Sequence, residues 1–178
     1  MSRIWKLPVV ILEKVEVNIK GNTITVKWPL WELSFDFSNK VGVSVNEKEV
    51  VVTKNEDKAN ALWGTTRSII DNMMVGVTVG YKKSLEIVWV WYKFEVVPGK
   101  LILSIGYSHK VEMEIPSVLK VSMDEKLKNV LHVSGIDKQA VWEFAAKVKS
   151  KKKPEPYKGK GIKYLGEHVR RKAGKTGK

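Results

Sequence analysis

Residues 15–27, VEVNIKGNTITVK, are the stretch that decides which fold we expect. Apolar and polar residues alternate from Val15 to Lys20, and the alternation resumes from Thr23 to Lys27, after Gly21-Asn22. A period of two predicts a β-strand with one buried face, because successive side chains point to opposite faces of a sheet. A Gly-Asn pair between two such runs is typical of a tight hairpin turn. The stretch therefore predicts an antiparallel hairpin.

The rest of the first half continues with strands and then changes period. The further strand-like runs are Glu32–Phe37, Val41–Val45 and Glu49–Thr53. A helix is predicted next, from residues that recur at helical spacing: Ala59, Leu62, Thr66, Ile69, Ile70, Met73 and Val77. Its other face carries Arg67, Ser68, Asp71 and Asn72. Asn55 or Asp57 is a candidate for the N-cap, because short polar side chains accept hydrogen bonds from the first turn.

The second half of the chain repeats this plan. Strands are expected at Ser84–Tyr92, Phe94–Val97, Leu101–Gly106, Val111–Ile115, Val118–Met123 and Asn129–Ser134. A helix follows from about Asp137 to Lys149 and should bury Val141, Phe144, Ala145 and Val148. A shift of about 80 residues lays one half over the other and brings Asp57-Lys58 onto Asp137-Lys138. We therefore predict an α+β fold of two tandem repeats, each a small antiparallel sheet covered by one helix.

Composition narrows the class of protein. The chain has 178 residues, is 43% hydrophobic and contains no cysteine, so it can bury a core but cannot form disulfides or thiolate metal sites. Lys6 and Pro8 interrupt the short apolar run near the start, which is unlike a secretory signal. No run approaches the 18 apolar residues of a membrane helix. We expect a soluble, cytoplasmic protein.

The positive charge is concentrated at one end of the chain. Residues 147–178 carry thirteen Lys and Arg against Glu155 and Glu167, a net of +11, whereas the whole chain is +13. Pro154, Pro156 and five glycines argue against a packed helix or strand after Lys153. Lysines among glycines and tyrosines are typical of an extended segment that binds nucleic acid, through phosphates and stacked bases.

Three modules follow from this pattern. We expect an N-terminal sheet-plus-helix module over residues 1–81, a second one over 82–153 and a basic RNA-binding extension over 154–178. Two other interpretations of the extension stay open: a disordered, solvated tail, and a segment attracted to anionic lipid. The loop of Ser108, His109 and Lys110 either faces the same partner or is an ordinary solvated hairpin tip.

The sequence offers little for catalysis. His132 falls in the middle of a strand, where a packed or surface imidazole is expected, and no acid at a recognisable spacing accompanies His109. The ending VRRKAGKT resembles a phosphate-binding loop only superficially, because Val169 stands where that motif requires a glycine. We expect no enzyme, no cofactor, no metal and no small-molecule substrate.

Several segments together resemble a known family. They are EPYKGKGIKY, GEHVRRKAGKTGK, KLPVVI near the start, GTTRSII, YKKSLEIV, LILSIGYSH and HVSGIDKQAV. In combination they are similar to the bacterial large-subunit ribosomal protein L-six family over essentially the whole chain.

The resemblance implies a fold and a function. The family fold is two sheet-plus-helix repeats, and its members are structural constituents of the large ribosomal subunit. They bind large-subunit rRNA near the base of the factor-binding stalk and the sarcin–ricin loop, beside other ribosomal proteins and translation factors. Carried over to this chain, the implied rRNA-binding residues are Lys153, Tyr157, Lys158, Lys160, Lys163, Tyr164, Arg170, Arg171, Lys172, Lys175 and Lys178.

The chain departs from the family pattern at its tryptophans. Positions where the family usually has glycine hold Trp5, Trp28, Trp31, Trp89, Trp91 and Trp142, and also Lys14. Trp63 replaces a usual histidine and Leu30 a usual lysine. A tryptophan at positive φ would cost roughly 1–2 kcal/mol in backbone strain. The alternative function is therefore a Trp-rich protein-interaction module with a passive basic tail, in which Trp89 and Trp91 share one side of a strand.

Overall fold

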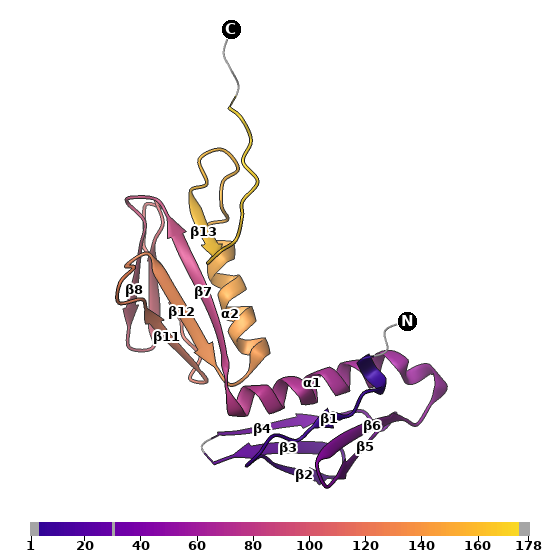
Figure 1. Ribbon diagram of the computed structural model, residues 1–178. Coiled ribbons are helices and arrows are strands. Elements are labelled where there is room, and N and C mark those ends of the chain that lie inside the picture. The colour runs from indigo at the N-terminus through magenta and orange to yellow at the C-terminus, as the bar shows by residue number, and fades with distance from the viewer. Residues whose placement is uncertain (1–3, 30, 175–178) are drawn as a thin grey trace. The chain divides into compact units, whose positions relative to one another are not determined.

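The computed structural model describes residues 4–29 and 31–174, which form two compact units (Figure 1). The first unit runs to Gly80 and includes Ile136–Lys138. The second consists of Tyr81–Gly135 and the residues from Gln139 onward. Each unit has one α-helix and antiparallel strands among its described residues, so the predicted α+β class is confirmed.

The first unit contains two three-stranded sheets. One is made by β2 (Glu16–Lys20), β3 (Thr23–Trp28) and β4 (Trp31–Asp36), and the other by β1 (Val9–Val10), β6 (Glu49–Lys54) and β5 (Val41–Asn46). The predicted hairpin is confirmed: Ile19 faces Ile24 across β2 and β3, and Gly21 has a φ of 59° in the turn. A short 3-10 turn, Ile4–Lys6, precedes the first strand.

Helix α1 (Asn60–Thr78) closes the first unit by packing on strands of both sheets, β3 and β6. It buries Thr66, Ile70, Met73 and Val77, as the helical spacing predicts, against Ile24 and Val50. Leu62 belonged to the predicted face but is 42% exposed. The predicted cap is wrong, because a 3-10 turn (Asp57–Ala59) leads directly into the helix and the N-cap residue is Ala59, which makes no side-chain cap. The Asn55 amide instead donates to the carbonyl of Asn39, at 2.9 Å.

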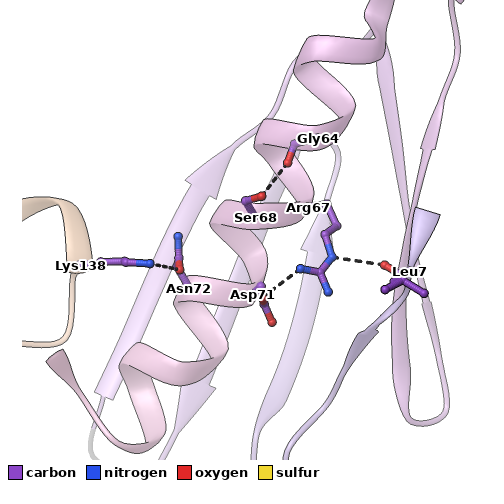
Figure 2. A network of polar contacts seen from close by, with 7 residues as sticks. All are labelled: Leu7, Gly64, Arg67, Ser68, Asp71, Asn72 and Lys138. Carbon is purple, nitrogen blue, oxygen red and sulfur yellow. Dashed lines mark hydrogen bonds and ion pairs between the residues drawn. The ribbon is translucent and has the colours of Figure 1, made fainter. Parts of the chain in front are cut away.

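The polar side of α1 fastens the start of the chain to the helix. Arg67 donates from Nε to the carbonyl oxygen of Leu7 at 3.2 Å and from Nη1 to Oδ2 of Asp71 at 2.9 Å, as Figure 2 shows. Ser68 donates back to the carbonyl of Gly64 in the same helix. Of the residues predicted to lie opposite the apolar stripe, Arg67 therefore contacts the segment before β1, and Asp71 pairs with it.

The second unit is built on a four-stranded sheet. Its strand order is β11 (Leu119–Met123), β12 (Val130–Gly135), β7 (Tyr81–Val88) and β13 (Gly161–Tyr164). A three-stranded sheet of β10 (Val111–Glu114), β9 (Lys100–Ser104) and β8 (Lys93–Val97) accompanies it. Helix α2 (Lys138–Lys151) lies along the larger sheet and buries Val141, Phe144, Ala145 and Val148, all as predicted (Figure 1). Each unit thus has two small sheets where one was expected.

Strand β13 contradicts the expectation that nothing packs after Lys153. Gly161 faces Val88 and Ile162 faces Ile87 along the edge of β7, and the Ile162 side chain is fully buried. Gly161 has a φ of 139°, and a Cβ there would lie 2.6 Å from the carbonyl oxygen of Lys153. The glycine that suggested a loose chain is required for close packing, because only a residue without a side chain fits.

Candidate nucleic-acid interface

The segment that follows α2 forms an ordered loop. The N–H of Glu155 donates to the carbonyl of Lys160 at 2.9 Å, and the N–H of Gly159 donates to the carbonyl of Glu155 at 3.0 Å. The chain then passes through β13 and returns, since the N–H of Lys172 donates to the carbonyl of Pro156 at 2.9 Å. Residues 155–160 and 171–172 therefore lie together, and we call them the basic loop.

Three lysines of the charge-rich region are paired with acids of the second unit, and one of them, Lys147, meets Glu143 one turn earlier in α2 at 2.6 Å. Lys149 Nζ lies 2.6 Å from Oε1 of Glu167, and Lys163 Nζ lies 3.2 Å from Oε2 of Glu86. The hydrogen bond from Lys149, together with one from the N–H of Tyr164, lowers the pKa of Glu167. The expectation of a terminus free along its whole length is therefore wrong for this part, which is folded onto its own module.

Five other cations of the region have exposed side chains. Within residues 4–29 and 31–174, no ion pair engages the exposed side chains of Lys153, Lys158, Arg170, Arg171 and Lys172. These side chains keep their charge available for an external anion. Lys175 and Lys178, which the resemblance also implicated, lie outside the described residues.

The loop of Ser108, His109 and Lys110 reaches the same end of the second unit. The neighbouring Tyr107 hydroxyl donates to the carbonyl of Lys151 at 2.9 Å, at the last residue of α2. Lys152 lies over the Tyr107 ring at 4.7 Å, and His109 stacks on that ring at 6.3 Å. Lys110 differs, because its Nζ pairs with Glu95 at 3.2 Å. The structure therefore brings this loop beside the residues that precede the basic loop.

The two tyrosines of the region differ in how open their rings are. Tyr157 is 49% exposed, so its ring is accessible. Tyr164 is half-buried, and the ammonium groups of Lys83 and Lys149 lie 4.7 and 4.4 Å from its ring centre. Tyr164 also borders an open groove of about 440 Å³, lined by Ala146, Lys149, Ser150, Lys153, Pro154 and Tyr164. Only Tyr157 of this pair presents an open ring for stacking.

A third loop joins this end, at residues 89–92. Strand β7 ends at Val88, so Trp89 and Trp91 stand in a turn, and the prediction that both lie on a strand is wrong. The Trp89 ring packs under Lys160 Nζ at 3.8 Å. The sequence analysis did not predict this contact, because it did not predict β13. The pairing of β13 with β7 brings Lys160 to Trp89, and the glycines around β13 gave no sign of a strand.

His132 has a structural environment. Its Nε2 lies 3.0 Å from Oδ2 of Asp124, and its Nδ1 lies 2.8 Å from the Ser84 hydroxyl. The three residue types are those of a hydrolase triad, but the ring nitrogens are exchanged relative to that arrangement, and Ser84 lies within the central strand β7. The described part of the chain holds no group of three metal-ligating side chains. Nor does either helix there combine the length and apolar character that a membrane crossing needs.

Comparison with known proteins decides the family. The profile of the family described as Ribosomal protein L6 matches residues 12–80 and 91–165. The chain belongs to this family. A large ribosomal subunit protein uL6 of Halothermothrix orenii is 51% identical over 99% of this chain and 100% of its own length. Proteins of the same name from Clostridium botulinum and Dictyoglomus thermophilum are 48% and 47% identical, each over 100% of this chain and 99% of its own length.

The tryptophans that depart from the L6 family pattern do not carry the backbone strain that was expected of them. Among the described non-glycine residues, positive φ occurs at Lys14, with φ of 67°, and at none of the tryptophans. Trp63 donates from Nε1 to the carbonyl of Val52 at 2.7 Å and packs against Trp5 at 4.9 Å. Trp142 meets Tyr81, the first residue of β7, edge-on at 5.7 Å. Leu30 lies outside the described residues.

Proposed function

We propose that this L6 family member binds large-subunit rRNA with the end of its second unit that carries the basic loop. The bound rRNA would lie near the base of the factor-binding stalk and the sarcin–ricin loop. The observation that carries the proposal is the cluster of unpaired cations on the basic loop, which includes Lys158, Arg171 and Lys172. Cations held by an ordered backbone pay little conformational entropy when they meet phosphates. Release of counterions would then supply much of the affinity.

Family membership makes the chain a structural protein of the large subunit of the cytoplasmic ribosome. We propose that it has no catalytic role. Neighbouring ribosomal proteins and translation factors are the further partners we propose for it. The second unit would supply the RNA contact, because its loops present the exposed cations and the open ring of Tyr157.

A Trp-rich protein-interaction module is the competing proposal. It requires the tryptophans to form one apolar face. Trp28 packs against the core of the first unit and is paired with Trp31 at the end of β3 and β4. Trp89 is 38% exposed in the second unit, and Lys160 Nζ lies over its ring at 3.8 Å. These contacts do not favour a single apolar face, so we retain the rRNA-binding proposal.

The test replaces charges rather than deleting the terminus, because deletion of Pro154–Lys178 would also remove β13 and its buried Ile162. The triple variant Lys158→Gln, Arg171→Gln and Lys172→Gln is compared with a matched triple variant of exposed lysines in the first unit, Lys20→Gln, Lys27→Gln and Lys48→Gln.

Binding is measured to an rRNA fragment that contains the stalk base and the sarcin–ricin loop, over a range of salt concentrations. The basic-loop variant should bind more weakly and lose about 2 units from the slope of log K against log salt. The first-unit variant should stay close to the unsubstituted protein. An equal loss of affinity in both variants, or no loss in the basic-loop variant, would refute the placement of the interface.

A further inference from the structure

Trp91 is the most exposed tryptophan among the described residues. Its side chain is 79% exposed and that of Val90 is 82% exposed, at the tip of the turn that follows β7. No ring contact, hydrogen bond or cation engages Trp91 within the described chain. Exposed apolar side chains of this size mark interaction sites, because burying them elsewhere is favourable.

A lysine of the basic loop contacts the turn that carries Trp91. Trp89, two residues earlier, lies under Lys160 at 3.8 Å, and this position is fixed because Gly161 pairs with Val88. The guanidinium of Arg171 lies beside Gly159, with Nη2 3.7 Å from the place where a Cβ would stand. The basic loop itself contains one carboxylate, that of Glu155. Glu95, on the strand β8 that follows the Trp91 turn, is paired with Lys110.

We propose that Trp91 stacks on an unpaired base of the bound RNA while Lys160 and Arg171 face the flanking phosphates. The inference rests on the rRNA-binding function proposed above and adds to it a preference for RNA with an unstacked base. A paired base inside a helix hides its faces, whereas a bulged or looped base offers one to an aromatic ring. Lysine is depleted from the cores of protein–protein interfaces, so this setting favours RNA over a protein partner.

The experiment uses the full chain and two RNA stems that differ by one nucleotide. One stem carries a single bulged 2-aminopurine, and the other is fully paired. Base stacking on an aromatic side chain is worth about 1–3 kcal/mol per base, so Trp91→Ala should weaken binding to the bulged stem roughly tenfold or more. Binding to the paired stem and the salt slope should both stay unchanged, because no phosphate contact is lost.

Two further variants keep the result interpretable. Trp91→Phe retains a flat ring and should recover most of the affinity and the quenching of 2-aminopurine fluorescence. Leu127→Ala removes an apolar side chain that is 53% exposed in another turn of the same unit. This variant should keep its affinity for both the bulged stem and the paired stem. Thermal unfolding of Trp91→Ala should match the unsubstituted protein, because the ring has no partner to lose.

The outcomes separate the two proposals. If the unsubstituted protein binds neither stem nor rRNA, the proposed function fails and this inference with it. If it binds both stems and Trp91→Ala changes nothing, or weakens both equally, only the stacking role is overturned. It is likewise overturned if Trp91→Ala keeps RNA affinity but loses a ribosomal protein that co-purifies with the unsubstituted chain.

Discussion

Lys149 Nζ lies between the two carboxylate oxygens of Glu167, 2.6 Å from Oε1 and 2.7 Å from Oε2. One residue belongs to α2 and the other follows β13, so the pair ties the segment after the last strand to the helix. Both side chains are partly buried, and Glu167 also accepts the N–H of Tyr164. The contact gives the charge-rich terminus a defined position.

Glu167→Gln should lower the free energy of unfolding by about 1 kcal/mol at neutral pH, because it removes a partly buried ion pair. The Lys149 hydrogen bond is the main cause of the lowered pKa of Glu167, so the folded-state value lies below the unfolded one. The contribution is therefore complete above the unfolded pKa and is lost as pH falls through the folded pKa. Urea unfolding of both proteins over a series of decreasing pH values checks this; a difference that does not shrink as the solution becomes more acidic would contradict it.

Asp124 should titrate well below an ordinary aspartate. Its carboxylate accepts the N–H groups of Leu127 and Lys126 and the Nε2–H of His132, and these hydrogen bonds lower its pKa to about 2. Because the folded pKa lies below the unfolded value, the stabilisation is present above about pH 4 and is lost as pH falls toward 2. A carboxyl carbon NMR titration measures the pKa directly, and Asp124→Asn identifies the signal. An Asp124 midpoint near pH 4 would show that these hydrogen bonds do not form.

Lys14→Gly should stabilise the protein. Lys14 is exposed and has φ of 67°, which costs a residue with a side chain roughly 1–2 kcal/mol. Glycine relieves the strain but adds freedom to the unfolded chain, so the net gain should be about 0.5–1 kcal/mol in urea unfolding. Lys14→Ala is the control, because it removes the same long side chain and keeps the strain. An equal gain in both variants would assign the effect to the lysine side chain instead.

Ile162→Ala should destabilise the second unit by about 3 kcal/mol, because the side chain is fully buried beside Ile87 and Leu85 in the core. Leu165→Ala lies three residues away, where the side chain is 51% exposed, and should cost less than about 1 kcal/mol. Chemical denaturation of both variants compares them. Similar small effects would show that β13 is not part of the core.

Local pattern was enough to predict most elements. The hairpin around Gly21, the apolar face of α1 at Ile70 and Val77, and the four buried residues of α2 follow from periods of 2 and 3.6, which short stretches of chain carry by themselves. The charge concentration could also be read directly, and the exposed Lys158 and Arg171 lie where it indicated.

Pattern failed where a distant partner decided the outcome. Residues 161–164 have too few alternating positions to predict a strand, and they become one because the edge of β7 offers hydrogen bonds and a place for Ile162. Trp89 and Trp91 continued a strand-like alternation, yet β7 ends at Val88 and the chain turns toward β8. The alternation of apolar and polar residues indicates which side chains suit a strand. It does not indicate where the strand stops pairing with its neighbour.

By itself, the sequence determined that this chain forms antiparallel strands and two amphipathic helices, and that its surplus cations gather near the C-terminus. Only the tertiary structure decided which cations are paired and which are presented, since Lys149 and Lys163 meet Glu167 and Glu86 while Lys158 and Arg171 do not. The physical reason is that periodicity is a property of neighbours along the chain. Ion pairing and strand pairing depend on residues that folding brings together.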